Sequence, residues 1–278
     1  MAKDPIQRTQ RQRVVIPQHS ILFIFLIIST LSKNTQSLSS STPNKKFTVK
    51  VCQNKDCLKQ FGGEGLVQTF HDLIPPSWEE DSIANDAKSF ISVECSGCLS
   101  QCGKGPNIMI EESSGKTTTP GKLYFGVDGV GAASAVLDVA CGLDSPIELL
   151  IASSSMIKAR SASSPSKKES LLNPTIEKLS THPEFSTSTA YAHALTMRAD
   201  ARLELIPPNI QGALEDIQIA SSILPTDAKV WRVMADAQEA NGDIKAAVKS
   251  VMKWSEYDPS FRTKAKKELS RLSSSLNC

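Results

Sequence analysis

The chain has 278 residues, a length that allows about two domains. Hydrophobic residues make up 40% and charged residues 22%, which is typical of a chain able to bury a core. The formal net charge of +2, from 31 basic and 29 acidic residues, excludes a strongly basic nucleic-acid binder and a strongly acidic disordered tail.

Residues 1–44 have the composition of a targeting leader. They hold five basic residues against one acid, and the apolar run Ile21 to Ile28 precedes a stretch rich in serine and threonine. Crossing a bilayer takes roughly 20 apolar residues in a helix, so this run is too short. We therefore expect a removable leader and no membrane span in the mature chain. A short apolar run after a basic start fits a secretory signal, whereas the arginine and serine content fits an organelle transit peptide.

The next segment, residues 45–142, has the pattern of an α/β domain. Alternating apolar residues predict strands, and longer apolar periods predict helices. The Pro75-Pro76 pair ends the first helix. The order of elements indicates a thioredoxin-type α/β sandwich. The strands are expected at 47–52, 90–94, 107–111 and 123–126, and the helices at 57–74 and 129–140.

Beyond residue 142 the sequence predicts helices alone. A helix is expected at about 145–158 and another at 170–181, with the serine-rich stretch Ser161–Lys168 between them as a flexible linker. Residues 260–276 are expected to form a capping helix. We therefore divide the chain into a leader (1–44), an α/β domain (45–142), a helix with linker (143–169) and an all-α domain (170–278).

Within the last segment, a sequence repeat has a period of 34 residues. Small residues at this spacing let two antiparallel helices pack closely, and the prolines end the second helix. The pattern resembles tetratricopeptide repeats, which implies a helical surface that docks a protein partner. The matched pairs are Ala201 and Ala235, Ala213 and Ala247, Pro225 and Pro259, Met197 and Trp231, and Ile217 and Val251.

The chemistry of the chain lies in its cysteines. All seven are outside the leader, and five fall within residues 52–102. An odd, clustered set favours metal binding in a reducing compartment over a secreted disulfide framework. Cys52 and Cys57 form a C-x4-C pair at a strand end, and Cys98 and Cys102 form a C-x3-C pair on a glycine-rich loop. Two bridged iron atoms need four soft terminal ligands, which two cysteine pairs on neighbouring loops would supply.

The pattern Cys52-x4-Cys57 … Gly97-Cys98-x3-Cys102-x2-Gly105-Pro106 resembles the thioredoxin-like [2Fe–2S] ferredoxins. The resemblance covers about residues 45–142. It implies a thioredoxin-like ferredoxin fold in which all four cysteines ligate one [2Fe–2S] cluster, and a one-electron carrier that meets a redox partner protein. Together with tetratricopeptide-like repeats, this is similar to a plant chloroplast arrangement, with the mitochondrion and the secretory pathway as alternatives.

Other interpretations of the same residues remain open. Zinc fits four thiolates, and Cys95-Ser-Gly-Cys98 is a C-x-x-C dithiol, although it precedes a loop instead of opening a helix. Cys95 has no place in the ferredoxin pattern. A scaffold or assembly factor with a structural or sensory metal site is the alternative function. No substrate chemistry is needed, so we do not expect an enzyme. The histidines lack ligand spacing and are predicted to be surface or packing residues: His19, His71, His182 and His193.

Overall fold

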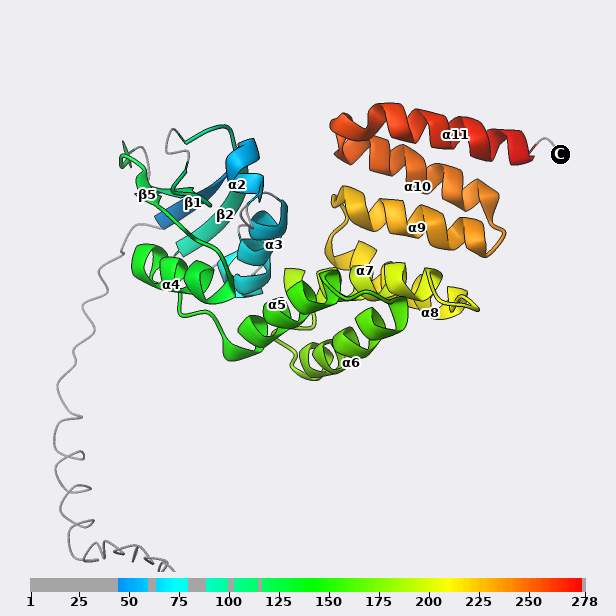
Figure 1. Ribbon diagram of the computed structural model, residues 1–278, viewed down its shortest axis with the longest axis horizontal. Coiled ribbons are helices and arrows are strands. Elements are labelled where there is room, and N and C mark those ends of the chain that lie inside the picture. The colour runs from blue at the N-terminus through cyan, green and yellow to red at the C-terminus, as the bar shows by residue number, and fades with distance from the viewer. Residues whose placement is uncertain (1–44, 60–63, 80–88, 100–102, 115–116, 277–278) are drawn as a thin grey trace, which may run out of the picture. The chain divides into compact units, whose positions relative to one another are not determined.

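The computed structural model describes residues 45–59, 64–79, 89–99, 103–114 and 117–276. Within these ranges, strands and helices are interspersed up to Cys141, and helices alone follow (Figure 1). The structure therefore confirms the predicted order of an α/β region followed by a helical region. The predicted leader lies outside the described residues.

Five strands form a mixed sheet in the order β2-β1-β3-β4, and β5 also pairs with β3. The first strand, β1 (Lys45–Cys52), runs parallel to β2 (Ser89–Ser96) and antiparallel to β3 (Ile108–Ser114). The short strands β4 (Thr117–Thr118) and β5 (Lys122–Tyr124) run antiparallel to β3. The parallel pair places the carboxyl ends of β1 and β2 side by side at one edge of the sheet.

One face of the sheet is covered by two helices. Phe47, Val49 and Val51 alternate along β1 and are buried in one core with residues of α3 (Glu64–Leu73) and α4 (Val130–Cys141). Alternation of this kind is typical of a strand with a single buried face. On the opposite face, Lys50 of β1 forms an ion pair of 2.8 Å with Glu111 of β3.

The structure describes the helix predicted over residues 57–74 on either side of residues 60–63. Its first part belongs to α2 (Lys55–Lys59) and its second part is α3, while residues 60–63 lie outside the described residues. The end is as predicted, because α3 stops at Leu73 and Pro76 opens the short 3-10 helix η2 (Pro76–Trp78). Proline disfavours the continuation of a helix because it lacks the N–H that bonds to the preceding turn.

In the helical region, successive helices pack against one another in chain order (Figure 1). In the first of these helices, α5, Leu149 belongs to the helical core, whereas Leu150 packs against the core of the sheet region. This helix therefore joins the two cores. The helices are α5 (Ile147–Arg160), α6 (Pro165–Thr181), α7 (Thr189–Leu203), α8 (Ile210–Ile223), α9 (Ala228–Ala240), α10 (Ile244–Tyr257) and, after the 3-10 helix η3 (Pro259–Phe261), α11 (Arg262–Leu276).

The linker predicted at Ser161–Lys168 is shorter in the structure, because α6 already begins at Pro165. The Oγ of Ser164 accepts a hydrogen bond of 3.3 Å from the N–H of Lys167. Pro165 stands at the start of the helix, where a missing N–H costs nothing. Serine followed by proline is thus a helix start here, and the prediction of flexibility from composition was wrong for residues 165–168.

The 34-residue period corresponds to a repeated helix pair. Helices α8 and α10 start 34 residues apart, at Ile210 and Ile244. Each begins with a capping side chain, since Asn209 accepts from the N–H of Gly212 and Asp243 from that of Ala246, both at 3.0 Å. The matched small residues are all buried, and a proline follows the end of each helix.

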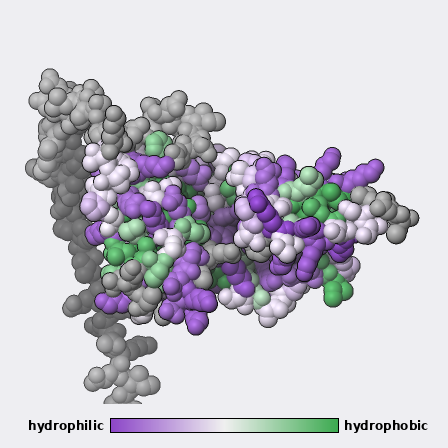
Figure 2. All heavy atoms as spheres, turned by 90° about the horizontal axis from the view of Figure 1, so that it is seen from above, coloured by the Kyte–Doolittle hydropathy of each residue, from purple (hydrophilic) through white to green (hydrophobic). Residues whose placement is uncertain are grey.

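Hydrophilic side chains are spread over the face shown in Figure 2, with hydrophobic ones in small groups between them. Exposed large hydrophobic residues occur on several elements; Val139 is on α4, for example, and Ile147 and Ile151 share one helix. Of the helices in the described ranges, none has the length and apolar character needed to cross a bilayer.

Candidate functional site

The first candidate site lies at the carboxyl ends of the parallel strands. Cys52 is the last residue of β1 and stands opposite Ser96, the last residue of β2. The loop that carries Cys98 starts here, and a backbone hydrogen bond of 2.8 Å from Gln53 N–H to Ser96 C=O fixes its start. The Cys52 N–H donates to Asn107 C=O at 3.1 Å and fixes its other end. The loop is thus held at both ends beside Cys52.

Cys52 and Cys57 form a buried pair of thiols. Helix α2 begins soon after β1 and turns Cys57 back toward the strand end, and the two side chains hydrogen-bond to one another. Cys52 is 2% exposed and Cys57 is 1% exposed. Burial alone raises the pKa of Cys52, but the backbone N–H groups of Asn54 and Leu99 and the Cys57 side chain donate to its sulfur, and the net effect is a lowered pKa.

The glycine-rich loop approaches this pair closely. A Cβ added to Gly105 would lie 2.7 Å from the Sγ of Cys57, closer than van der Waals contact allows. Only a residue without a side chain fits between the loop and this sulfur. The backbone of the second cysteine loop therefore reaches the first cysteine pair at two points, Leu99 and Gly105.

The structure brings together two of the predicted ligands, Cys52 and Cys57. Cys98 is exposed on the loop after β2, and Cys102 lies outside the described residues. Among the described residues, no group of three or more His, Cys, Asp or Glu side chains has the geometry of a metal site. No disulfide joins the described cysteines either. Cys95, at the end of β2, is exposed and lines a neighbouring pocket.

A second cluster of titratable groups lies where the sheet region meets the helices, and no sequence motif predicted it. His193 of α7 is buried, and its Nδ1 is 2.6 Å from Oδ1 of Asp72 on α3. Its Nε2 is 3.6 Å from Oδ2 of Asp227, the residue that caps α9. The interpretation of His193 as an ordinary packing residue therefore missed an ion pair between the two regions.

The charges around His193 control its protonation. Burial alone lowers the pKa of an imidazole, but the carboxylates of Asp72 and Asp227 outweigh this and raise the pKa of His193 to about 9. The neighbouring His71 behaves in the opposite way, because burial and the charge of His193 lower its pKa. At neutral pH, therefore, His193 is a cation held between two carboxylates.

No protein-family model matches the chain, and no curated protein is significantly similar to it.

Proposed function

We propose that the protein is a one-electron carrier that binds a [2Fe–2S] cluster through Cys52, Cys57, Cys98 and Cys102. The observation that carries this proposal is the buried Cys52–Cys57 pair at the strand ends, with the loop of Cys98 and Cys102 anchored on both sides of it. Two thiol pairs on adjacent loops are the ligand set that a [2Fe–2S] cluster requires.

The residues around these thiols fit such a group. Cluster sulfur atoms need backbone N–H donors close by, and the N–H groups of Asn54 and Leu99 already donate to the sulfur of Cys52. Gly105 permits the close backbone approach that a side chain would prevent. The Nε2 of Gln53, next to Cys52, is buried without a hydrogen-bond partner in the described part of the chain, and it is available as a further donor.

The lowered pKa of Cys52 favours the thiolate form, and the thiolate is the form that ligates iron. When bound, the cluster would accept and release one electron. The chain itself would contribute thiolate ligands, N–H donors that stabilise negative charge on sulfur, and partial exclusion of water by the buried positions of Cys52 and Cys57. No bond of a substrate has to be made or broken, so we do not propose an enzyme.

The finer fold assignment belongs to the same proposal. A parallel β1–β2 pair, an antiparallel β1–β3 pair and two helices on one face support a thioredoxin-like ferredoxin domain over residues 45–142. Two successive helix pairs, whose second helices α8 and α10 start 34 residues apart, are followed by α11 and support a tetratricopeptide-like domain over residues 170–278. We propose that these repeats dock a protein partner, and that the leader directs the chain to the chloroplast.

The test is chemical analysis of the anaerobically purified chain. Iron and acid-labile sulfide in equal amounts are expected, and zinc without sulfide would contradict the proposal in favour of a structural site. Cys98→Ser should abolish visible cluster absorption because it removes a ligand. Cys95→Ser is the matched control, since Cys95 lies three residues away on the same segment, and it should leave the absorption largely intact. Loss of the cluster in the Cys95 variant alone would overturn the ligand assignment.

A further inference from the structure

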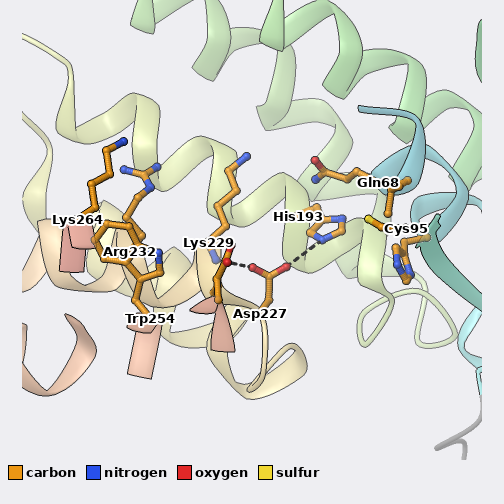
Figure 3. A pocket seen from close by; sticks show the side chains of 12 residues that line it. Gln68, Cys95, His193, Asp227, Lys229, Arg232, Trp254 and Lys264 are labelled. Atoms are coloured by element: carbon orange, nitrogen blue, oxygen red, sulfur yellow. Dashed lines mark hydrogen bonds and ion pairs between the residues drawn. The ribbon is translucent and has the colours of Figure 1, made fainter. Parts of the chain in front are cut away.

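A pocket of about 550 Å³ lies between the sheet region and the helices. Gln68 of α3 and Cys95 of β2 line one end, and His193 of α7 lies in the middle (Figure 3). The other end is formed by the first turns of α9 and by residues of α10 and α11. Its volume is in the range of about 300–1,000 Å³ that small-molecule sites occupy.

Three cationic side chains gather at the end of the pocket that the helices form. They are Lys229 and Arg232 of α9 and Lys264 of α11, which lie along the same side in Figure 3. Arg232 is oriented by ion pairs with Asp200 at 3.0 Å and Asp236 at 2.8 Å, neither of which lines the pocket.

The two carboxylates that line the pocket are already engaged as helix caps. Asp227 accepts from the backbone N–H of Lys229 at 2.7 Å and from that of Val230 at 3.2 Å, and it faces the cationic His193. Asp258 accepts from the N–H of Ser260 at 2.9 Å and from its hydroxyl. Among the described residues, neither carboxylate forms a direct ion pair with the ammonium of Lys229; Asp227 contacts that residue through its backbone N–H.

Lys229 is a pocket cation whose ammonium has no ion-pair partner among the described residues. In the described ranges, no acceptor lies within hydrogen-bond or ion-pair distance of its Nζ, although part of the side chain reaches solvent. The pocket walls desolvate the ammonium, and Arg160 and Arg232 lie close enough to repel it, so its pKa is lowered despite the charges of Asp200 and Asp227. A negative charge at this position would relieve the repulsion.

Several of the remaining lining residues are apolar and favour anions that carry an apolar part. Val67, Ala228 and the indole of Trp254 give the pocket an apolar wall beside the cations. We infer that the pocket is a binding site for a small organic phosphate or carboxylate, with the anionic group against Lys229 and Arg232 and an apolar or aromatic part against Trp254. This site is separate from the proposed cluster ligands and goes beyond electron transfer.

The experiment is calorimetric titration of the full chain at constant ionic strength with phenyl phosphate, inorganic phosphate and benzyl alcohol. Phenyl phosphate should bind with saturation at one site and more tightly than either fragment, because it alone offers both the anion and the ring. Lys229→Gln should weaken phenyl phosphate binding by roughly tenfold, the loss of one charge-assisted contact. Lys267→Gln, on an exposed residue of α11 outside the pocket lining, is the control and should leave the affinity unchanged.

Two results would overturn the inference. One is the absence of saturable heat with phenyl phosphate, and the other is equal affinity in the wild type and in Lys229→Gln. A thermal melt of each variant guards against misfolding, and Lys229→Gln should melt no lower than the wild type because no residue in the described ranges forms an ion pair with the ammonium that it removes. Lys264→Gln provides a second variant from another helix and should also weaken binding.

Discussion

The cysteine site depends most directly on Gly105, because there is no space for a side chain at this position. An added Cβ would lie 2.7 Å from the Sγ of Cys57, so Gly105→Ala must displace either the loop or the sulfur. We expect this variant to lose most of its iron and sulfide, measured per chain after anaerobic purification. Gly97→Ala is the matched control, because a Cβ at Gly97 meets no atom within 4 Å. Equal cluster content in the two variants would contradict the proposed role of Gly105.

His193 makes stability depend on pH. Its folded pKa of about 9 lies above the unfolded value of about 6.5, so its contribution is fully present below pH 6.5 and is lost as the pH rises through 9. His193→Gln cannot gain the charge and should therefore be less stable than the wild type at low pH, by a few kcal/mol at about 1.4 kcal/mol per pKa unit.

The measurement is the free energy of unfolding of both proteins by denaturant across this pH range. The two curves should converge as the pH rises toward and beyond 9. Asp72→Asn should show the same convergence, because Asp72 provides the shortest contact to the imidazole. Parallel curves for wild type and His193→Gln would show that the imidazole is not the titrating group.

The cysteine pair and His193 differ in how well the sequence predicts their contacts. Cys52 and Cys57 could be paired in advance, because a short spacing across a strand end brings two side chains together whatever the rest of the fold does. The Asp72–His193 contact joins residues 121 positions apart, and it depends on how α3 packs against α7. No local pattern contains that information.

At the scale of elements, the helix pairs depend on small residues at their contact surfaces. Ala213 of α8 is 0% exposed and occupies one of the positions matched by the 34-residue period. Ala213→Leu should lower the free energy of unfolding by about 1–3 kcal/mol through overpacking. Ile219→Leu, on an exposed position of the same helix, should change it by less than about 0.5 kcal/mol. Equal effects in a denaturant titration would show that α8 does not pack as described.

The elements themselves could largely be predicted. Strand alternation, helix period and proline positions each arise from local geometry, and the matched alanines and prolines placed α8 and α10 in register. Ser164 and Pro165 were misjudged because serine and proline are typical both of linkers and of helix starts. The structure resolves this ambiguity through the hydrogen bond from Lys167 N–H to Ser164 Oγ.

In the whole molecule, direct contacts join the sheet region to the helices. Helix α3 packs against α5 and α7, and Thr189 at the start of α7 donates a hydrogen bond of 2.9 Å to Glu79. The pocket with Lys229 lies at this junction, and Cys95 connects it to the strand that leads to the cysteine loop. An anion bound against Lys229 and Arg232 would lie at the end of the pocket away from Cys95.

The near-neutral net charge of +2 conceals this local separation of charge. It excluded a strongly basic nucleic-acid binder, but it gave no indication of the buried imidazolium or of the three cations in the pocket. Both arise when helices distant in sequence pack together, so composition could not reveal them.

We propose that the four cysteines hold a redox-active [2Fe–2S] cluster. Visible and electron paramagnetic resonance spectra of the anaerobically purified chain, oxidised and then reduced, test it most directly. We predict visible absorption that partly bleaches on reduction, no resonance signal when oxidised, and the signal of a single unpaired electron when reduced. A colourless protein that contains zinc and gives no signal in either state would contradict the claim.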